Sequence, residues 1–290
     1  MNSSNVRLTL NGKDIHLIGT AHVSRESIDE VTAAIREEKP GMVCVELDEG
    51  RFASITKKDS WERLDVSKVL REGKGFLLIA NMALVSFQRR LGNELGVKPG
   101  EEMIAAVDTA KEMGIAFSLC DREVQVTLRR AWARCSLWSK CKLLATLLTS
   151  AFVTEKLSAD EIENLKDSDE LSGMMTELSN YLPSVKETLI DERDRYLAAK
   201  IWDAAKQADG SAGAGSTIAV VGAGHLQGIQ SQLEQYAAGE ALPDLDKLAT
   251  IPPRKFLSKA AGWIIPVLIL GLIAFGFFRA GSDVSLHMLR

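Results

Sequence analysis

Short apolar runs separated by turn residues predict the first elements of the chain. Residues 6–10 and 15–19 are two such runs, and Asn11-Gly12 lies between them. An Asn-Gly pair tolerates the positive φ angles of a tight hairpin turn. We therefore expect the chain to open with a β-hairpin.

A strand–helix–strand unit is predicted after the hairpin. Ser24 can cap a helix, Lys-Pro-Gly at 39–41 can end it, and its apolar positions recur at helical spacing: Ile28, Val31 and Ile35. Residues 42–47, which are apolar except for Glu46, are then typical of a buried strand. Parallel pairing with a right-handed crossover is the strong default for such a unit, so His22 and Glu46 are expected to be neighbours at one sheet edge.

The same unit recurs twice, each time with polar residues after the strand. The helix 102–113 leads to the strand 115–120 and then to Asp121-Arg122, and the helix 191–207 leads to the strand 217–221 and then to His225. These patterns predict an α/β (α+β) fold with a mixed, largely parallel central sheet, flanking helices and a helical insertion at about 123–190. Ligands in open α/β sheets bind beyond the carboxyl ends of the strands, which favours a site there.

The end of the chain has a different character. Residues 260–278 carry no charge and are about long enough to cross a hydrocarbon core, which predicts a transmembrane helix; the alternative is a buried core helix. A domain at 1–240, a linker at 241–259 and a tail at 279–290 complete the expected organisation. More basic residues precede the span than follow it, which places the N-terminal domain in the cytoplasm.

Composition narrows the classes of function. A net charge of −4 gives no broad positive field, so we expect no nucleic-acid partner. The four cysteines lack a C-x-x-C spacing, which argues against a zinc knuckle or a disulfide scaffold. Two apolar stretches, 76–87 and 143–153, are too short to span a bilayer and are interpreted as core, a dimer contact or a groove for an apolar ligand. A homodimer is expected from them.

The first candidate residues for a functional site lie in a repeated motif. Gly-x-x-His occurs at 19–22 and again at 222–225, each time after a β-branched run and before a helical pattern. Two histidines and one carboxylate form a known hydrolytic metal set, and His22, His225 and Glu46 supply those types. Each histidine taken alone could equally be a hydrogen-bonded structural residue.

Other candidates surround this set. Gly19 and Gly222 stand where a strand turns into a helix, a place that often needs positive φ or a close backbone approach to a substrate. Arg122 could stabilise an oxyanion or could form a salt bridge with Asp121 or Glu123. Glu192 and Arg193 begin a helix, where charged residues are also ordinary. The segment 220–228 imitates a dinucleotide loop, but no strand with a terminal acidic residue follows it.

Five segments taken together resemble the TraB/PrgY (pheromone shutdown) family, whose wider relatives include GumN, the Tiki proteins and the EreA/ChaN-like folds. They are GTAHVS, VCVELD, LCDREV with TLRR, DERDRYL and VVGAGHL, which occur in order over nearly all of residues 5–235. The resemblance implies a metal-dependent, peptidase-like site built from His22, Glu46 and His225, with Arg122, Glu192 and Arg193 as further candidates. It implies Mn²⁺ or Co²⁺, with Zn²⁺ as a third option. Family members often continue into several membrane helices, so the chain is expected to be truncated.

Two functions are carried forward. The first is a membrane-anchored, cytoplasm-facing metal-dependent hydrolase of peptides, in which Glu46 binds the metal or accepts a proton and Arg122 neutralises the oxyanion. The second is a peptide-binding or sequestering module of the pheromone-shutdown type, which holds its ligand without turnover. A weaker third is a regulatory domain on a transporter-like membrane portion.

Overall fold

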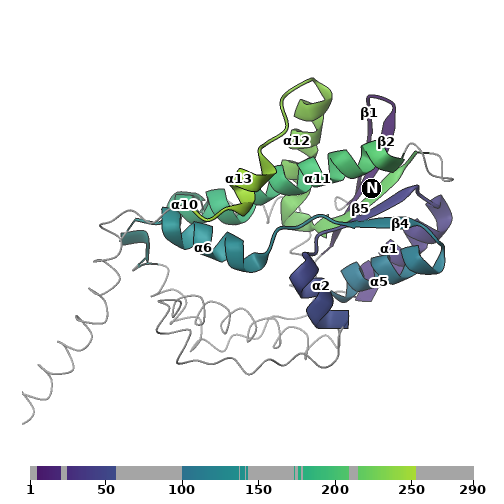
Figure 1. Cartoon of the computed structure of the whole chain (residues 1–290), viewed down its shortest axis with the longest axis horizontal. Helices are drawn as coiled ribbons and strands as arrows, with labels where there is room; N and C mark the ends of the chain where they lie inside the picture. Colours follow the sequence, from purple (N-terminus) through teal and green to yellow (C-terminus); the bar gives the residue numbers. More distant parts are fainter. Residues whose placement is uncertain are drawn as a thin grey trace, which may run out of the picture. The chain divides into compact units, whose positions relative to one another are not determined.

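The structure is a computed structural model of the whole chain (Figure 1). It describes residues 5–20, 25–56, 100–136, 138–140, 142, 173, 176–177, 179–208 and 215–252. The chain divides into two compact units, Met1–Ile251 and Pro252–Arg290. All the elements below belong to the first unit.

A five-stranded mixed sheet forms the centre of this unit. Its strands are β1 (Asn5–Leu10), β2 (Lys13–Thr20), β3 (Met42–Val45), β4 (Ala116–Leu119) and β5 (Thr217–Gly222), in the spatial order β1-β2-β5-β3-β4. Only the β1–β2 pair is antiparallel, and the other three pairings are parallel. The predicted mixed, largely parallel sheet is therefore confirmed, and its parallel strands end at one common edge.

Helices cover both faces of the sheet (Figure 1). One face packs on α11 (Glu192–Ala208) and α12 (Leu226–Ala237), and the other packs on α1 (Arg25–Glu38) and α5 (Glu101–Glu112). The remaining described helical elements are α2 (Glu49–Thr56), α6 (Val124–Arg134), α10 (Pro183–Lys186), a π-helical turn (Glu187–Asp191), a 3₁₀ turn (Ala223–His225) and α13 (Leu245–Ala249).

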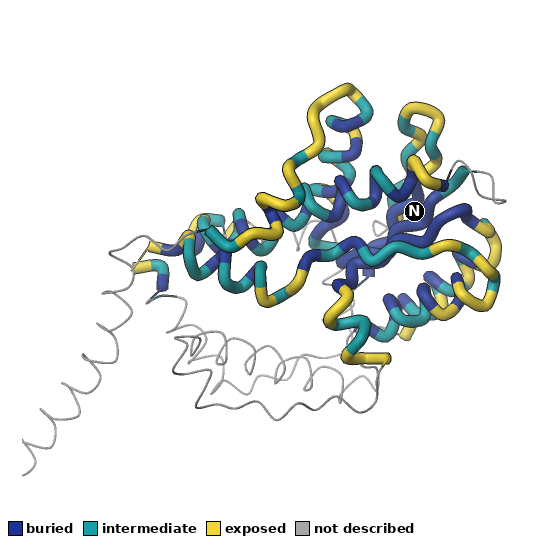
Figure 2. The backbone as a smooth tube through the Cα atoms, in the orientation of Figure 1, coloured by how far each residue is buried: buried dark blue, intermediate teal, exposed yellow. Residues whose placement is uncertain are grey.

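Successive side chains of a strand point to opposite faces of the sheet, which explains the two hydrophobic cores. Leu17, Cys44 and Ala219 point to α11 and α12, while their neighbours Ile18 and Val43 point to α1 and α5. Burial on both faces accounts for the continuous apolar runs that predicted β3 and β5. The inner strands β2, β5 and β3 are accordingly buried along most of their length, whereas the edge strands β1 and β4 are half-buried or exposed (Figure 2).

The predicted hairpin is confirmed in detail. Asn11 and Gly12 connect β1 to β2 with φ angles of 50° and 77°. Two successive positive φ angles match the right-handed twist of the flanking strands, which is why Asn-Gly is favoured at this place.

The order of the strands corrects one prediction. β2 and β3 are parallel but do not pair, because β5 lies between them and forms hydrogen bonds with both. All six residues of β5 are buried, so the strand that arrives last in the sequence takes the central position. The α1 crossover therefore skips one strand.

Several predictions fall outside the described residues. They concern His22, the apolar stretches 76–87 and 143–153, the span 260–278 and the tail 279–290. Within the ranges that the structure does describe, no helix combines the length and the apolarity needed to cross a bilayer.

Candidate functional site

Polar residues gather at the carboxyl edge of the sheet, as the strand pattern predicted. Glu46 directly follows β3, Asp121 lies two residues beyond β4, and His225 lies three residues beyond β5. Glu46 and His225 are each about 5% exposed. The parallel direction of the three strands brings these side chains from distant parts of the sequence to one place.

Arg193, near the start of α11, connects the three. Its Nη2 donates to Glu46 Oε1 at 2.5 Å and to Asp121 Oδ2 at 2.8 Å, its Nε donates to Asp121 Oδ1 at 3.2 Å, and its Nη1 donates to His225 Nε2 at 3.0 Å. Burial disfavours the charged guanidinium, but Asp121 and Glu46 outweigh it and raise the pKa of Arg193 above its ordinary value. The arginine is thus a fixed positive charge in the centre of the site.

Glu46 is held by the backbone as well as by Arg193. Its Oε2 accepts a hydrogen bond from the Gly222 N–H at 2.7 Å, just before the helical turn that leads into α12. Its Oε1 lies 3.6 Å from His225 Nε2. The glycine itself is extended, with φ −63° and ψ 139°, so of the two reasons expected for a glycine there, positive φ does not apply. Gly19 lies within β2 and pairs with Val221.

The orientation of His225 is set by Asp194. Asp194 Oδ1 lies 2.5 Å from His225 Nδ1, and both side chains are buried. A guanidinium can only donate, so Nε2 accepts from Arg193, and Nδ1 carries the ring proton and donates to Asp194. Burial raises the pKa of Asp194, although its hydrogen bond with His225 acts in the opposite direction.

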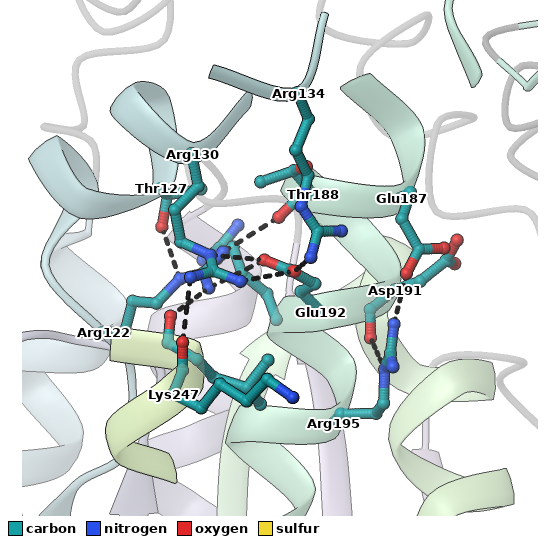
Figure 3. Close-up of polar contacts among 12 residues, drawn as sticks. Arg122, Thr127, Arg130, Arg134, Glu187, Thr188, Asp191, Glu192, Arg195 and Lys247 are labelled. Carbon is teal, nitrogen blue, oxygen red and sulfur yellow. Dashed lines mark hydrogen bonds and ion pairs between the residues drawn. The ribbon is translucent and has the colours of Figure 1, made fainter. Parts of the chain in front are cut away.

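A second charged cluster is built around Glu192, the residue before Arg193 (Figure 3). The Glu192 carboxylate, 1% exposed, forms ion pairs with three arginines: Arg122 at 3.0 Å, Arg130 at 2.8 Å and Arg134 at 2.8 Å. Burial opposes the charge of Glu192, but the hydrogen bonds from Arg130 and Arg122 outweigh it and lower the pKa of the carboxyl.

Arg122 belongs to this second cluster. Besides Glu192, it donates to Thr127 Oγ1 at 2.9 Å and to the carbonyl oxygens of Leu248 and Thr188 at 2.8 and 2.9 Å. These bonds favour the ion-pair interpretation of Arg122 over the oxyanion role, with Glu192 as its partner in place of Asp121 or Glu123. Arg193 is the cation that faces Glu46 and His225.

Three consecutive residues of α11 therefore reach different parts of the site, although Arg193 and Asp194 both contact His225. Successive residues on an α-helix point about 100° apart, so Glu192, Arg193 and Asp194 reach the arginine cluster, Glu46 and His225 respectively. Asp121 and Asp194 were missed as site residues. Their position after a strand and at a helix start was visible in the sequence, but acidic residues are ordinary at both places.

Two side chains of types that can bind a metal meet at this edge of the sheet. His225 Nε2 and Glu46 Oε1 face each other, and imidazole nitrogen with carboxylate oxygen suits Mn²⁺, Co²⁺ and Zn²⁺. Among the described residues, no group of three His, Cys, Asp or Glu side chains is arranged to hold a metal ion. The third predicted ligand, His22, lies outside those residues. The two donors fit a metal by their chemistry, and Arg193 contacts both.

The chain belongs to the TraB/PrgY/gumN family, whose model matches residues 6–240. It is 32% identical to an uncharacterised protein of Methanocaldococcus jannaschii over 267 residues, which cover 92% of this chain and 65% of that protein. TraB domain-containing proteins of Bos taurus and Homo sapiens are 28% and 26% identical over 93% and 94% of this chain, and over 74% and 75% of their own lengths. The chain thus spans about two thirds to three quarters of these relatives.

Proposed function

We propose that the protein is a metal-dependent hydrolase that acts on peptides. The observation that carries this proposal is the convergence of Glu46 and His225, 3.6 Å apart, at the carboxyl edge of the sheet. A buried imidazole and a buried carboxylate with a fixed cation beside them are suited to hydrolytic chemistry. Membership of the TraB/PrgY/gumN family agrees with the motifs from which the same function was expected.

Each residue has a role in this proposal. His225 and Glu46, together with His22, would hold Mn²⁺ or Co²⁺, with Zn²⁺ as a third option. A bound divalent ion would polarise the scissile carbonyl and lower the pKa of a bound water. Arg193 offers the positive charge on which a developing oxyanion can be stabilised, and Asp121 holds that guanidinium through two hydrogen bonds.

The test uses the full chain with a library of short peptides and added Mn²⁺, Co²⁺ or Zn²⁺. We expect metal-dependent cleavage, detected by mass spectrometry, that is lost in Glu46→Gln and in His22→Ala. Glu234→Gln is the matched control, because its exposed carboxylate lies on the surface of α12, where it accepts a hydrogen bond from Gln230. Cleavage that survives Glu46→Gln, or that needs no metal, would refute the proposal.

A peptide-binding module is the second candidate. Arg193 already donates to Glu46, Asp121 and His225, and a charged cluster satisfied in this way can serve recognition without turnover. Calorimetry with the same library separates the two functions. Retained binding with chemically unchanged peptides would favour the module.

The setting of the site is proposed as well. We infer from the sequence that residues 260–278 anchor the chain in a membrane with residues 1–240 on the cytoplasmic side, and that the protein forms a homodimer. Membrane fractionation of the full chain, compared with a chain that ends at residue 251, tests the anchor. Light scattering of the purified protein in detergent tests the dimer.

A further inference from the structure

We infer that Asp194 and Gly228 are positioning residues for His225. Asp194 accepts the Nδ1 proton and orients the ring in the tautomer whose Nε2 carries no proton, and Gly228 provides the space that the Asp194 carboxylate needs. The inference deepens the proposed function. Of its tests, only the measurement of metal affinity rests on that function.

The first step is the hydrogen-bond geometry. Asp194 Oδ1 and His225 Nδ1 are 2.5 Å apart, and the two residues are 6% and 5% exposed. On the opposite side of the ring, Nε2 accepts from Arg193 and lies 3.6 Å from Glu46 Oε1. A proton on Nε2 would face the guanidinium N–H and would leave Nδ1 with a lone pair against the Asp194 carboxylate. Only the Nδ1–H tautomer satisfies both neighbours.

The second step concerns Gly228, which lies one turn after His225 on α12. A Cβ atom at this position would lie 1.9 Å from Asp194 Oδ2, 2.5 Å from its Cγ and 3.0 Å from its Cβ. These distances leave no room for a methyl group at residue 228. The Asp194 carboxylate lies between that position and the His225 ring, with which it forms its hydrogen bond. Asp194 could avoid the methyl group only by leaving the ring.

Backbone conformation does not explain this glycine. Gly228 lies within the regular helix α12 and is absent from the described glycines with positive φ. Glycine inside a helix is unfavourable relative to alanine, so a helix gains nothing from it locally. The close approach of Asp194 provides the reason for its presence.

Asp194 and Gly228 also line an open depression of about 380 Å³ between α11 and α12, together with Asp191, Arg195, Ser231 and Gln232. Ser231 therefore provides a matched control, because Ser231→Ala alters the same depression without removing a partner of His225. Any effect that is specific to Gly228→Ala then arises from the contact with Asp194.

The experiment reads the two ring nitrogens of His225 by ¹⁵N NMR in the full chain without added metal. Signals are assigned by their loss in His225→Gln. We expect a protonated Nδ1 and an accepting Nε2 in the unmodified protein, in Ser231→Ala and in Asp194→Asn, whose amide oxygen can still accept. In Asp194→Ala and Gly228→Ala, the Nδ1 signal should shift because its hydrogen bond to the carboxylate is lost, while Arg193 still favours an accepting Nε2. An Nδ1 signal that is unchanged in Gly228→Ala or in Asp194→Ala would overturn the inference.

Thermal unfolding keeps the inference testable if Gly228→Ala folds poorly. The substitution should lower the Tm of the unmodified protein, yet leave unchanged or raise the Tm of Asp194→Ala, because the clashing carboxylate is then gone. An equal loss of Tm in both backgrounds would contradict the assigned role of Gly228.

Metal titration completes the test. Loss of a residue that orients a metal-binding histidine typically weakens metal affinity about 10–100-fold, so we expect a loss of that size for Mn²⁺ in Asp194→Ala. If the unmodified protein binds no metal, the proposed function fails, while the NMR result still decides the roles of Asp194 and Gly228.

Discussion

Replacement of Glu192 by glutamine is expected to destabilise the protein severely. The substitution keeps the shape of the side chain and removes its charge. Arg122 and Arg130, 2% and 3% exposed, would then remain as buried cations without their anion, while Arg134 can turn toward water. A buried charge that loses its partner is costly because the interior does not solvate it.

The magnitude follows from this burial. Breaking a buried ion pair by removing one partner costs about 3–5 kcal/mol, and Glu192→Gln affects two buried arginines at once. For a domain of this size, each kcal/mol lowers the Tm by roughly 2–4 °C. We therefore expect the Tm to fall by about 6–20 °C.

The assay is thermal and urea unfolding of the full chain, followed by circular dichroism in the same buffer and detergent for every variant. Glu187→Gln is the matched control, because Glu187 lies five residues before Glu192 and also pairs with an arginine, Arg195, but its side chain is 44% exposed. A pair this exposed contributes at most about 1 kcal/mol. Equal losses for Glu187→Gln and Glu192→Gln would refute the reasoning that burial makes the Glu192 cluster important for stability.

Three further predictions concern other parts of the unit. Burial lowers the pKa of His16 below 6.5 despite Glu38, so the unfolded chain binds the proton more readily than the folded protein does. Stability should therefore be lost as the pH falls below about 6.5. Between about pH 7.5 and 5.5, urea unfolding should show a smaller loss of stability for His16→Gln than for the unmodified protein. Gly12→Val should cost about 1–2 kcal/mol, measured by urea unfolding, because only the φ of 77° opposes a side chain there. Asp121→Asn should lower kcat/KM for peptide cleavage about 10–100-fold, because it weakens the two hydrogen bonds that hold Arg193. An unchanged kcat/KM would show that Arg193 takes no part in the reaction.

Local sequence patterns determined the elements of this protein. The hairpin at Asn11-Gly12, the helices that begin near residues 25, 101 and 192, and the strand β5 all follow from short-range periodicity and turn chemistry. The parallel direction of the strands then placed Glu46 and His225 at one edge, as predicted. Periodicity is a property of neighbouring residues, so it can be read without the rest of the fold.

Only the tertiary structure decided which side chains meet. The central place of β5 follows from its long-range pairing with β2 and β3. The exchange of Arg122 for Arg193 as the cation facing Glu46, and the contact of Asp194 with His225, depend on the rotation of α11 over the sheet. A rotation of about 100° would exchange the partners of Glu192, Arg193 and Asp194 without altering the helical pattern. The packing of α11 against the sheet sets that angle, and its apolar contacts come from strands far away in the sequence.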